Sequence, residues 1–322
     1  MPWREGLQLG LQVVPKAGES GMSLLLRAFQ ANGVHYANGV RWLGLDRRQG
    51  LSEADVATLA WALRLDFNDL RDRFVVLEIR GGGRWVHLAG QRLSRWIAPT
   101  TMLPKVCPDC LRETGGARIA WMTRAMPACR LHGRSMIQTC AACGRPLRWA
   151  RPAVRVCQCG RYFKPKQKVA LLEAAVQDWL SWVEATLHED EGSARQAMGK
   201  LPPALHGVTL DGAYRLVEAF GLFARPGDPA RNARSASTGL EECCGVLARG
   251  LRRLFDLGRA ESVAPSDFDA VYLPGLSELV NSPAAETDGS RAAWLLDVYR
   301  AMRPSGLNRV GSRPRRQMPL FL

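Results

Sequence analysis

The sequence predicts a mainly α-helical protein with a small β content, in which a cysteine-rich segment separates two helical regions. Apolar residues recur at helical spacing in the N-terminal third and again after residue 168. Runs of β-forming residues flank Gly81–Gly83. Seven of the nine cysteines lie between residues 107 and 159. We therefore expect an N-terminal helix-turn-helix-like domain with a small hairpin over 1–106, a double finger over 107–168, a C-terminal helical domain over 169–302 and a tail over 303–322.

The N-terminal part is predicted to contain short helices joined by tight turns. Leu24–Gly33 follows a capped start at Ser20–Ser23 and ends on a glycine. A short segment at Asn38–Leu43 comes next. Ser52–Asp55 resembles a capping box without its usual Glu, and Asp66–Phe74 is a further candidate helix. This pattern is typical of a helix-turn-helix module, although a generic small helical domain fits it equally well.

A hairpin and several longer helices are expected after these. Val75–Ile79 and Trp85–Leu88 lie on either side of the three glycines and predict the hairpin. Cys243 and Cys244 fall within an apolar helical pattern, and we interpret them as small core residues. The later helices are predicted at Lys168–His188, Asp211–Phe223, Gly239–Leu257 and Ser290–Met302, and loops at Ala224–Thr238 and Leu273–Asp288.

Positive charge is unevenly distributed along the chain. The 322 residues carry 44 Lys+Arg and 30 Asp+Glu, a formal net charge of +14. Basic and acidic residues number 14 and 9 in 1–106, 13 and 2 in 107–168, 12 and 19 in 169–302, and five and none in 303–322. The net charges are therefore +5, +11, −7 and +5. We expect a nucleic-acid partner at the middle segment, and the tail is either a basic arm or a frayed end.

The compartment is inferred from what the sequence lacks. No apolar run approaches the roughly 18–20 residues of a membrane-spanning helix. The N-terminus has neither the basic start nor the apolar stretch of a signal peptide. With 47% hydrophobic residues the chain can build a packed core. We expect a soluble, cytoplasmic protein without a membrane partner.

Eight residues of metal-ligand type form four close pairs in the middle segment. Two intervening residues let both side chains of a pair reach one tetrahedral ion, and Gly144 and Gly160 lie where such turns often need a permissive backbone. Disulfides would require an oxidising compartment, and a redox Cys-x-x-Cys usually accompanies a βαβ pattern that the sequence lacks. The pairs are Cys107 and Cys110, Cys129 and His132, Cys140 and Cys143, and Cys157 and Cys159.

These ligands suffice for two closed zinc sites. We assign the first two pairs to one Zn²⁺ and the last two to a second, while a cross-braced arrangement that joins the first pair to the third stays open. Catalytic zinc keeps an open position, and the sequence shows neither the zinc deaminase pattern nor a phosphate-binding loop. The segment is therefore predicted to be structural, and the protein not to be an enzyme.

The motifs around the cysteines resemble those of the TniQ/TnsD family of transposition proteins. Cys107-Pro-Asp-Cys110-Leu111 is similar to the family's Cys-Pro-x-Cys-Leu. Trp121 then precedes Cys129-Arg-Leu-His132-Gly133, and Cys140-Ala-Ala-Cys143-Gly144 follows, in the family's order. The resemblance covers about residues 20–160, including the helix at Ser23–Gly33. It departs from the family at Thr114–Ala117, where the approach to the Trp is shorter and less aromatic.

The resemblance implies a target-site selector without catalysis, as opposed to a transposase. Family members bind target DNA or, in CRISPR-associated transposons, a guide-RNA effector complex, and they recruit an AAA+ ATPase that regulates the transposase. Zinc fingers and an N-terminal helix-turn-helix are implied, and some members are homodimers. A bacterial, DNA-associated protein is expected on this likeness.

Arginines of the middle segment are the candidate phosphate contacts, because guanidinium groups bind phosphate in a bidentate manner. The alternative function is a RING-like ubiquitin ligase, whose ligand order is the same, but whose His is followed sooner by the next Cys. The candidate nucleic-acid-binding residues are Arg130, Arg134, Arg145, Arg148, Arg151, Arg155, Arg161, Lys164, Lys166 and Lys168.

Overall fold

The computed structural model describes residues 8–45, 50–78, 85–94, 97, 104–164, 172–188, 190–226, 228, 239–259 and 269–302. The predicted fold class is confirmed, since helices dominate and strands are few and short. The α-helices are α1 Gly21–Ala31, α2 Tyr36–Trp42, α3 Glu53–Leu63, α4 Phe67–Arg71, α5 Pro108–Thr114, α6 Ala174–Leu187, α7 Glu191–Met198, α8 Leu210–Gly221, α9 Leu240–Arg259, α10 Leu273–Asn281 and α11 Glu286–Met302. The short 3₁₀ helices are η2 Ile119–Met122 and η3 Pro203–Leu205, and the strands are β1 Val76–Leu77, β2 Trp85–Leu88, β3 Gln91–Ser94, β4 Ala128–Cys129 and β5 Arg134–Ser135.

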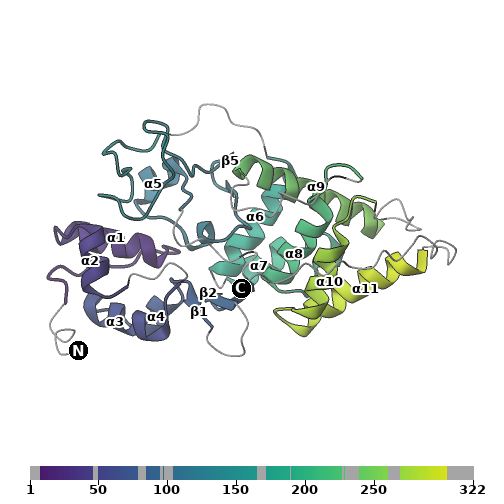
Figure 1. The fold of residues 1–322 in the computed structure, drawn as a ribbon, viewed down its shortest axis with the longest axis horizontal. Coiled ribbons are helices and arrows are strands. Elements are labelled where there is room, and N and C mark those ends of the chain that lie inside the picture. Colours follow the sequence, from purple (N-terminus) through teal and green to yellow (C-terminus); the bar gives the residue numbers. More distant parts are fainter. Residues whose placement is uncertain are drawn as a thin grey trace, which may run out of the picture.

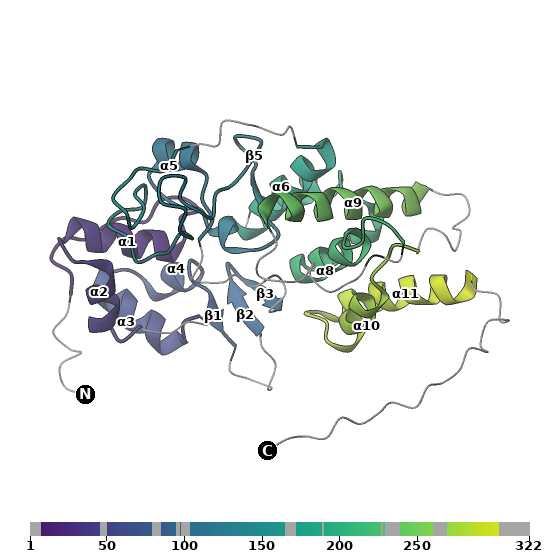
Figure 2. The ribbon, with the colours of Figure 1, turned by 45° about the horizontal axis from the view of Figure 1, so that its top comes forward.

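Helices α1–α4 lie at one end of the molecule and α8–α11 at the other, with the cysteine-rich segment beside α1 and α6 (Figures 1 and 2). The N-terminal helices begin where the capping residues predict. Ser20 caps α1 by accepting a hydrogen bond from Ser23 N. Ser52 and Asp55 form a reciprocal capping box at α3, so Asp serves in place of Glu. Helix α4 is shorter than predicted.

The small sheet is antiparallel, in the order β1-β2-β3. The expected pairing of the first two strands is confirmed, with Val76 opposite His87. Strand β3 was not predicted. It follows a two-residue turn, Ala89 and Gly90, whose φ angles are +46° and +69°. Such angles match the right-handed twist of a hairpin, and a non-glycine residue at the first position hides the signal in the sequence.

The predicted loop at Leu273–Asp288 is wrong, because it contains α10 and the start of α11. Pro274 stands in the first turn of α10, where a proline has no N–H to lose, and Leu276 and Leu279 are buried. Helix α6 begins at Ala174, later than predicted, and the residues just before 172 lie outside the described part, as does the tail 303–322. Cys243 and Cys244 in α9 are half-buried, so they lie at the margin of the core.

A hydrophobic cluster runs through the whole described chain, from α1 to α11. Two polar contacts within this cluster join segments that are far apart in the sequence. Ser94 of β3 donates its N–H and Oγ–H to the buried Asp211 of α8, over 2.7 and 2.6 Å. Trp179 of α6 is fully buried and donates its ring N–H to the Ala125 carbonyl at 2.9 Å. No helix in the described ranges is long and apolar enough to cross a membrane.

Candidate metal centres

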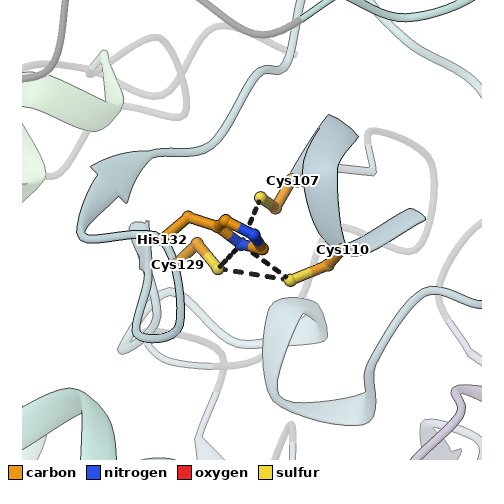
Figure 3. A group of neighbouring side chains, drawn as sticks. All are labelled: Cys107, Cys110, Cys129 and His132. Atoms are coloured by element: carbon orange, nitrogen blue, oxygen red, sulfur yellow. Dashed lines mark hydrogen bonds between the residues drawn. The ribbon is translucent and has the colours of Figure 1, made fainter. Parts of the chain in front are cut away.

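The first centre consists of four ligand-type side chains that converge on one point (Figure 3). Cys107 immediately precedes α5 and Cys110 lies in its first turn, which Pro108 starts. Cys129 ends β4, and His132 lies in the turn to β5. The start of the short helix α5 thus supplies one pair of ligands, and the β4–β5 hairpin supplies the other. The Nδ1 atom of His132 lies 3.5, 3.3 and 3.4 Å from the sulfur atoms of Cys107, Cys110 and Cys129.

A carboxylate orients the histidine from outside this centre. The Nε2 atom of His132 lies 3.0 Å from Glu113 Oε1 of α5. Because Nδ1 faces the three sulfur atoms, Nε2 is the nitrogen that carries hydrogen and donates to the carboxylate. Glu113 is not one of the paired Cys and His residues, so the ligand pattern in the sequence did not indicate its role. Its position three residues after Cys110 on a helix is the available signal.

The crowding of three thiols explains their shifted pKa values. Hydrogen bonds with Cys110 and Cys129 hold the pKa of Cys107 far below its usual range. Hydrogen bonds with Cys107 in turn raise the pKa of both neighbours, and repulsion by the Cys107 thiolate adds to the rise. A divalent cation relieves this conflict, because its positive charge offsets the repulsion among the three thiolates. The donor set therefore fits a metal ion.

The second centre is built from two matching turns. Cys140 donates its N–H to Arg145 O at 3.0 Å, and Cys157 donates to Arg161 O at 2.9 Å. Gly144 and Gly160 close the turns with φ of +68° and +81°, as their predicted role requires. The sulfur atoms of Cys140 and Cys159 are 3.9 Å apart, and those of Cys143 and Cys157 are 3.8 Å apart.

Thiol acidity differs within the second centre as well. Burial raises the pKa of Cys157 to about 12. Burial acts in the same direction on Cys140, but hydrogen bonds with the N–H groups of Ala142 and Cys143 and with the thiols of Cys157 and Cys143 together outweigh it and lower the pKa of Cys140 to about 7. These backbone donors are supplied by the turn itself, so the turn favours the thiolate that a metal ion needs.

The grouping of the eight residues is the sequential one. All ligand atoms of each centre lie within 4.8 Å of one another, with Cys107, Cys110, Cys129 and His132 in one and Cys140, Cys143, Cys157 and Cys159 in the other. A RING fold requires cross-braced pairs, so the geometry gives that alternative no support. Each centre can hold a metal ion.

Two of the predicted phosphate contacts, Arg130 and Arg134, pair with carboxylates of the protein. Arg130 contacts the buried Glu184 of α6 through Nε at 2.6 Å, and Arg118 contacts the other oxygen of the same carboxylate at 2.6 Å. Arg134 lies 3.2 Å from Asp109. These arginines join elements of the protein, and Glu184, an acid that the sequence did not single out, fastens α6 to the first centre.

The prediction for Arg151 is wrong, because this side chain is 1% exposed. Its guanidinium donates to Arg148 O and Val154 O, and it lies 4.9 Å from the Trp149 ring and 5.2 Å from the Phe163 ring. Lys166 and Lys168 lie outside the described residues. The remaining candidates, Arg145, Arg148, Arg155, Arg161 and Lys164, are exposed and lie beside the second centre.

The fold and the site define a helix-rich protein with two closed centres of Cys and His and a basic surface around the second. Residues 11–136 match the family model TniQ, so this part of the chain is a TniQ domain and the resemblance in the motifs is confirmed. The match associates the chain with transposition. It includes the first centre and ends before the second. No curated protein matches the chain.

Proposed function

We propose that the protein is a transposition target-selection adaptor that works without catalysis of its own. The observation that carries this proposal is the TniQ domain over residues 11–136. Both centres are closed by four protein ligands each, which suits a scaffold better than a reaction centre, because catalytic zinc keeps a position for water. The adaptor would bind target DNA, or a guide-RNA effector complex, and recruit an AAA+ ATPase that regulates the transposase.

Zinc is the metal that we propose for both centres. Zinc–sulfur bonds of about 2.3 Å in a regular tetrahedron place sulfur atoms about 3.8 Å apart. The sulfur–sulfur distances of 3.8 and 3.9 Å in the second centre fit this value. The first centre is slightly tighter, with donor distances of 3.3–3.5 Å to the histidine. The ion would supply folding energy, because its four ligands come together only in the folded chain.

The nucleic-acid contact is proposed for the exposed cations around the second centre. No acidic residue occurs between Glu113 and Glu173. Arg145, Arg148 and Arg155 are exposed in this interval, so phosphate groups would meet no opposing charge there. Helices α3 and α4, joined by a tight turn at Arg64, are a second candidate contact of helix-turn-helix type.

The acidic C-terminal region is the part that we propose for protein contacts. Residues 169–302 carry 12 basic and 19 acidic side chains, so this region repels DNA and suits a basic partner surface. The family resemblance suggests two partners for this region, the AAA+ ATPase and a second copy of the chain in a homodimer.

The decisive experiment measures targeted insertion with the ATPase and transposase of the same mobile element. Insertion at the target site is expected to require this chain, and the ATPase is expected to co-purify with it. A fourfold variant, Arg145, Arg148, Arg155 and Arg161 to Ala, should abolish both DNA binding and insertion. The matched control replaces two exposed arginines of the acidic region, Arg252 and Arg300, and should retain both. Insertion that proceeds equally well without the chain would refute the proposal.

A further inference from the structure

An exposed aromatic side chain stands on the second finger, which we define as residues 136–164. Tyr162 is 66% exposed, although a tyrosine ring buries readily. The guanidinium of Arg155 lies over this ring, 5.9 Å from its centroid. The ring therefore has one face beside a cation and most of its surface in water.

The backbone holds this side chain in a fixed direction. Tyr162 pairs with Val156 in an antiparallel bridge, and Phe163 N donates to Arg155 O at 3.0 Å. Cys157 N donates to Arg161 O at 2.9 Å within the same turn. The next ring, that of Phe163, packs against the buried Arg151. Neighbouring side chains of an extended segment point to opposite sides, so Phe163 anchors the finger and Tyr162 is presented outward.

Basic side chains surround this turn on the same finger. The exposed cations Arg155, Arg161 and Lys164 all lie within seven residues of Tyr162 in the sequence. Arg145 and Arg148 line a hollow of about 420 Å³ together with Pro146, Ala150 and Gln158. The finger thus offers flat apolar surface beside cations, which is the combination that binds a nucleotide by its base and its phosphate.

The finger has no element that fits a duplex groove. Residues 136–164 contain no helix, and their pairing is confined to isolated bridges. The major groove of a duplex admits a helix or a two-stranded ribbon, and the finger presents neither. An exposed ring can stack only on a base whose face is free, and bases inside a duplex have both faces covered. The chemistry of Tyr162 therefore favours unpaired bases.

We propose that the second finger binds single-stranded DNA, with Tyr162 stacked on an unpaired base and the surrounding cations on the adjacent phosphates. This inference rests on the proposed nucleic-acid contact and deepens it, because it names the strand state that the finger selects. The TniQ match ends at residue 136, so the finger lies wholly beyond it apart from its first residue.

The test uses the full zinc-loaded chain and a fluorescent oligothymidylate, with a duplex of equal length as the comparison. Tyr162→Ala should weaken single-strand binding by about five- to a hundredfold, the range for loss of one stacked base. Duplex binding should change less than about twofold, since its contacts are to phosphates. Tyr162→Phe keeps the ring and should bind like the parent. The control, Trp294→Ala, removes a 52%-exposed aromatic from α11 and should change neither.

A second readout separates stacking from charge. A 2-aminopurine placed in the oligonucleotide should lose fluorescence on binding the parent and the Phe variant, and keep it with the Ala variant. Equal zinc content in all variants excludes unfolding of the finger. Equal losses on both strand states, or no loss on either, would overturn the inference while leaving the proposed DNA contact intact. A parent protein that binds neither strand state would overturn both. Tighter binding to an RNA strand of the same sequence would overturn the assignment to DNA.

Discussion

The contact between Glu113 and His132 gives the most direct test of the first metal centre. Replacing Glu113 with Ala removes the acceptor that lies 3.0 Å from Nε2 of the proposed zinc ligand. Two opposite unit charges at that separation attract by about 1.4 kcal/mol in a water-like dielectric. The imidazole carries only part of a charge, which lowers this energy. The Glu113 side chain is 51% exposed, so solvent screens the pair incompletely, which raises it. We expect zinc affinity to fall about 10- to 100-fold at this centre.

The assay is a competition between the protein and a chelator of known zinc affinity, followed by cobalt substitution. Cobalt absorbs differently in a Cys₃His and a Cys₄ site, so the affected centre can be identified. Glu113→Gln keeps an acceptor without the charge and should fall between the parent and the Ala variant. The control, Glu53→Ala, removes an exposed carboxylate that pairs with Arg71 far from either centre. Unchanged zinc release from Glu113→Ala, or equal loss at both centres, would refute the reasoning.

Three further predictions concern packing, pH and the second centre. Gly250→Ala should lower the free energy of unfolding by about 1–3 kcal/mol, because its Cβ would lie 2.1 Å from Val217 O. Gly245→Ala in the same helix meets only the end of a flexible side chain, and chemical denaturation should show little change. Burial lowers the pKa of Lys105 to about 7 from 10.5, so above pH 7 the unfolded chain binds a proton that the folded chain lacks, and stability should rise with pH. Melting temperatures between pH 6.5 and 9 should show this rise in the parent and a smaller one in Lys105→Met; parallel curves would contradict it. Cys140→Ser should halve the zinc content measured by mass spectrometry and expose the second finger to protease, and full zinc content would argue against the centre.

Much of the site could be predicted because its information is local. A spacing of one or two residues fixes which side chains share a turn, so the eight ligands and the glycines at 144 and 160 are visible in the sequence. Ser20 and Ser52 cap their helices by bonding to the residue three positions further on, so these caps could also be predicted from the sequence. What the pattern left open was the partnership of the pairs, which depends on how the β4–β5 hairpin lies against α5.

The errors arose where distant parts of the chain decide the outcome. Arg151 looks like any other arginine of a basic segment, and only the rings of Trp149 and Phe163 around it reveal a buried packing role. Arg130 was predicted to bind phosphate, and the pattern did not reveal that Glu184, more than fifty residues away, pairs with it. Pro274 lies in a stretch that was predicted to be a loop, whereas its position in the first turn of α10 makes it a helix start.

Sequential pairing also bears on how the chain is made. Each set of ligands is complete within one short interval, residues 107–132 for the first centre and 140–159 for the second. Closing short loops costs less entropy than closing long ones, and contacts between near neighbours form early. A ribosome releasing this chain would therefore expose a finished metal site before α6 emerges. Helix α6, with Trp179 and Glu184, would then meet a surface that is already ordered, and the supply of metal during synthesis would decide whether the C-terminal region finds its docking place.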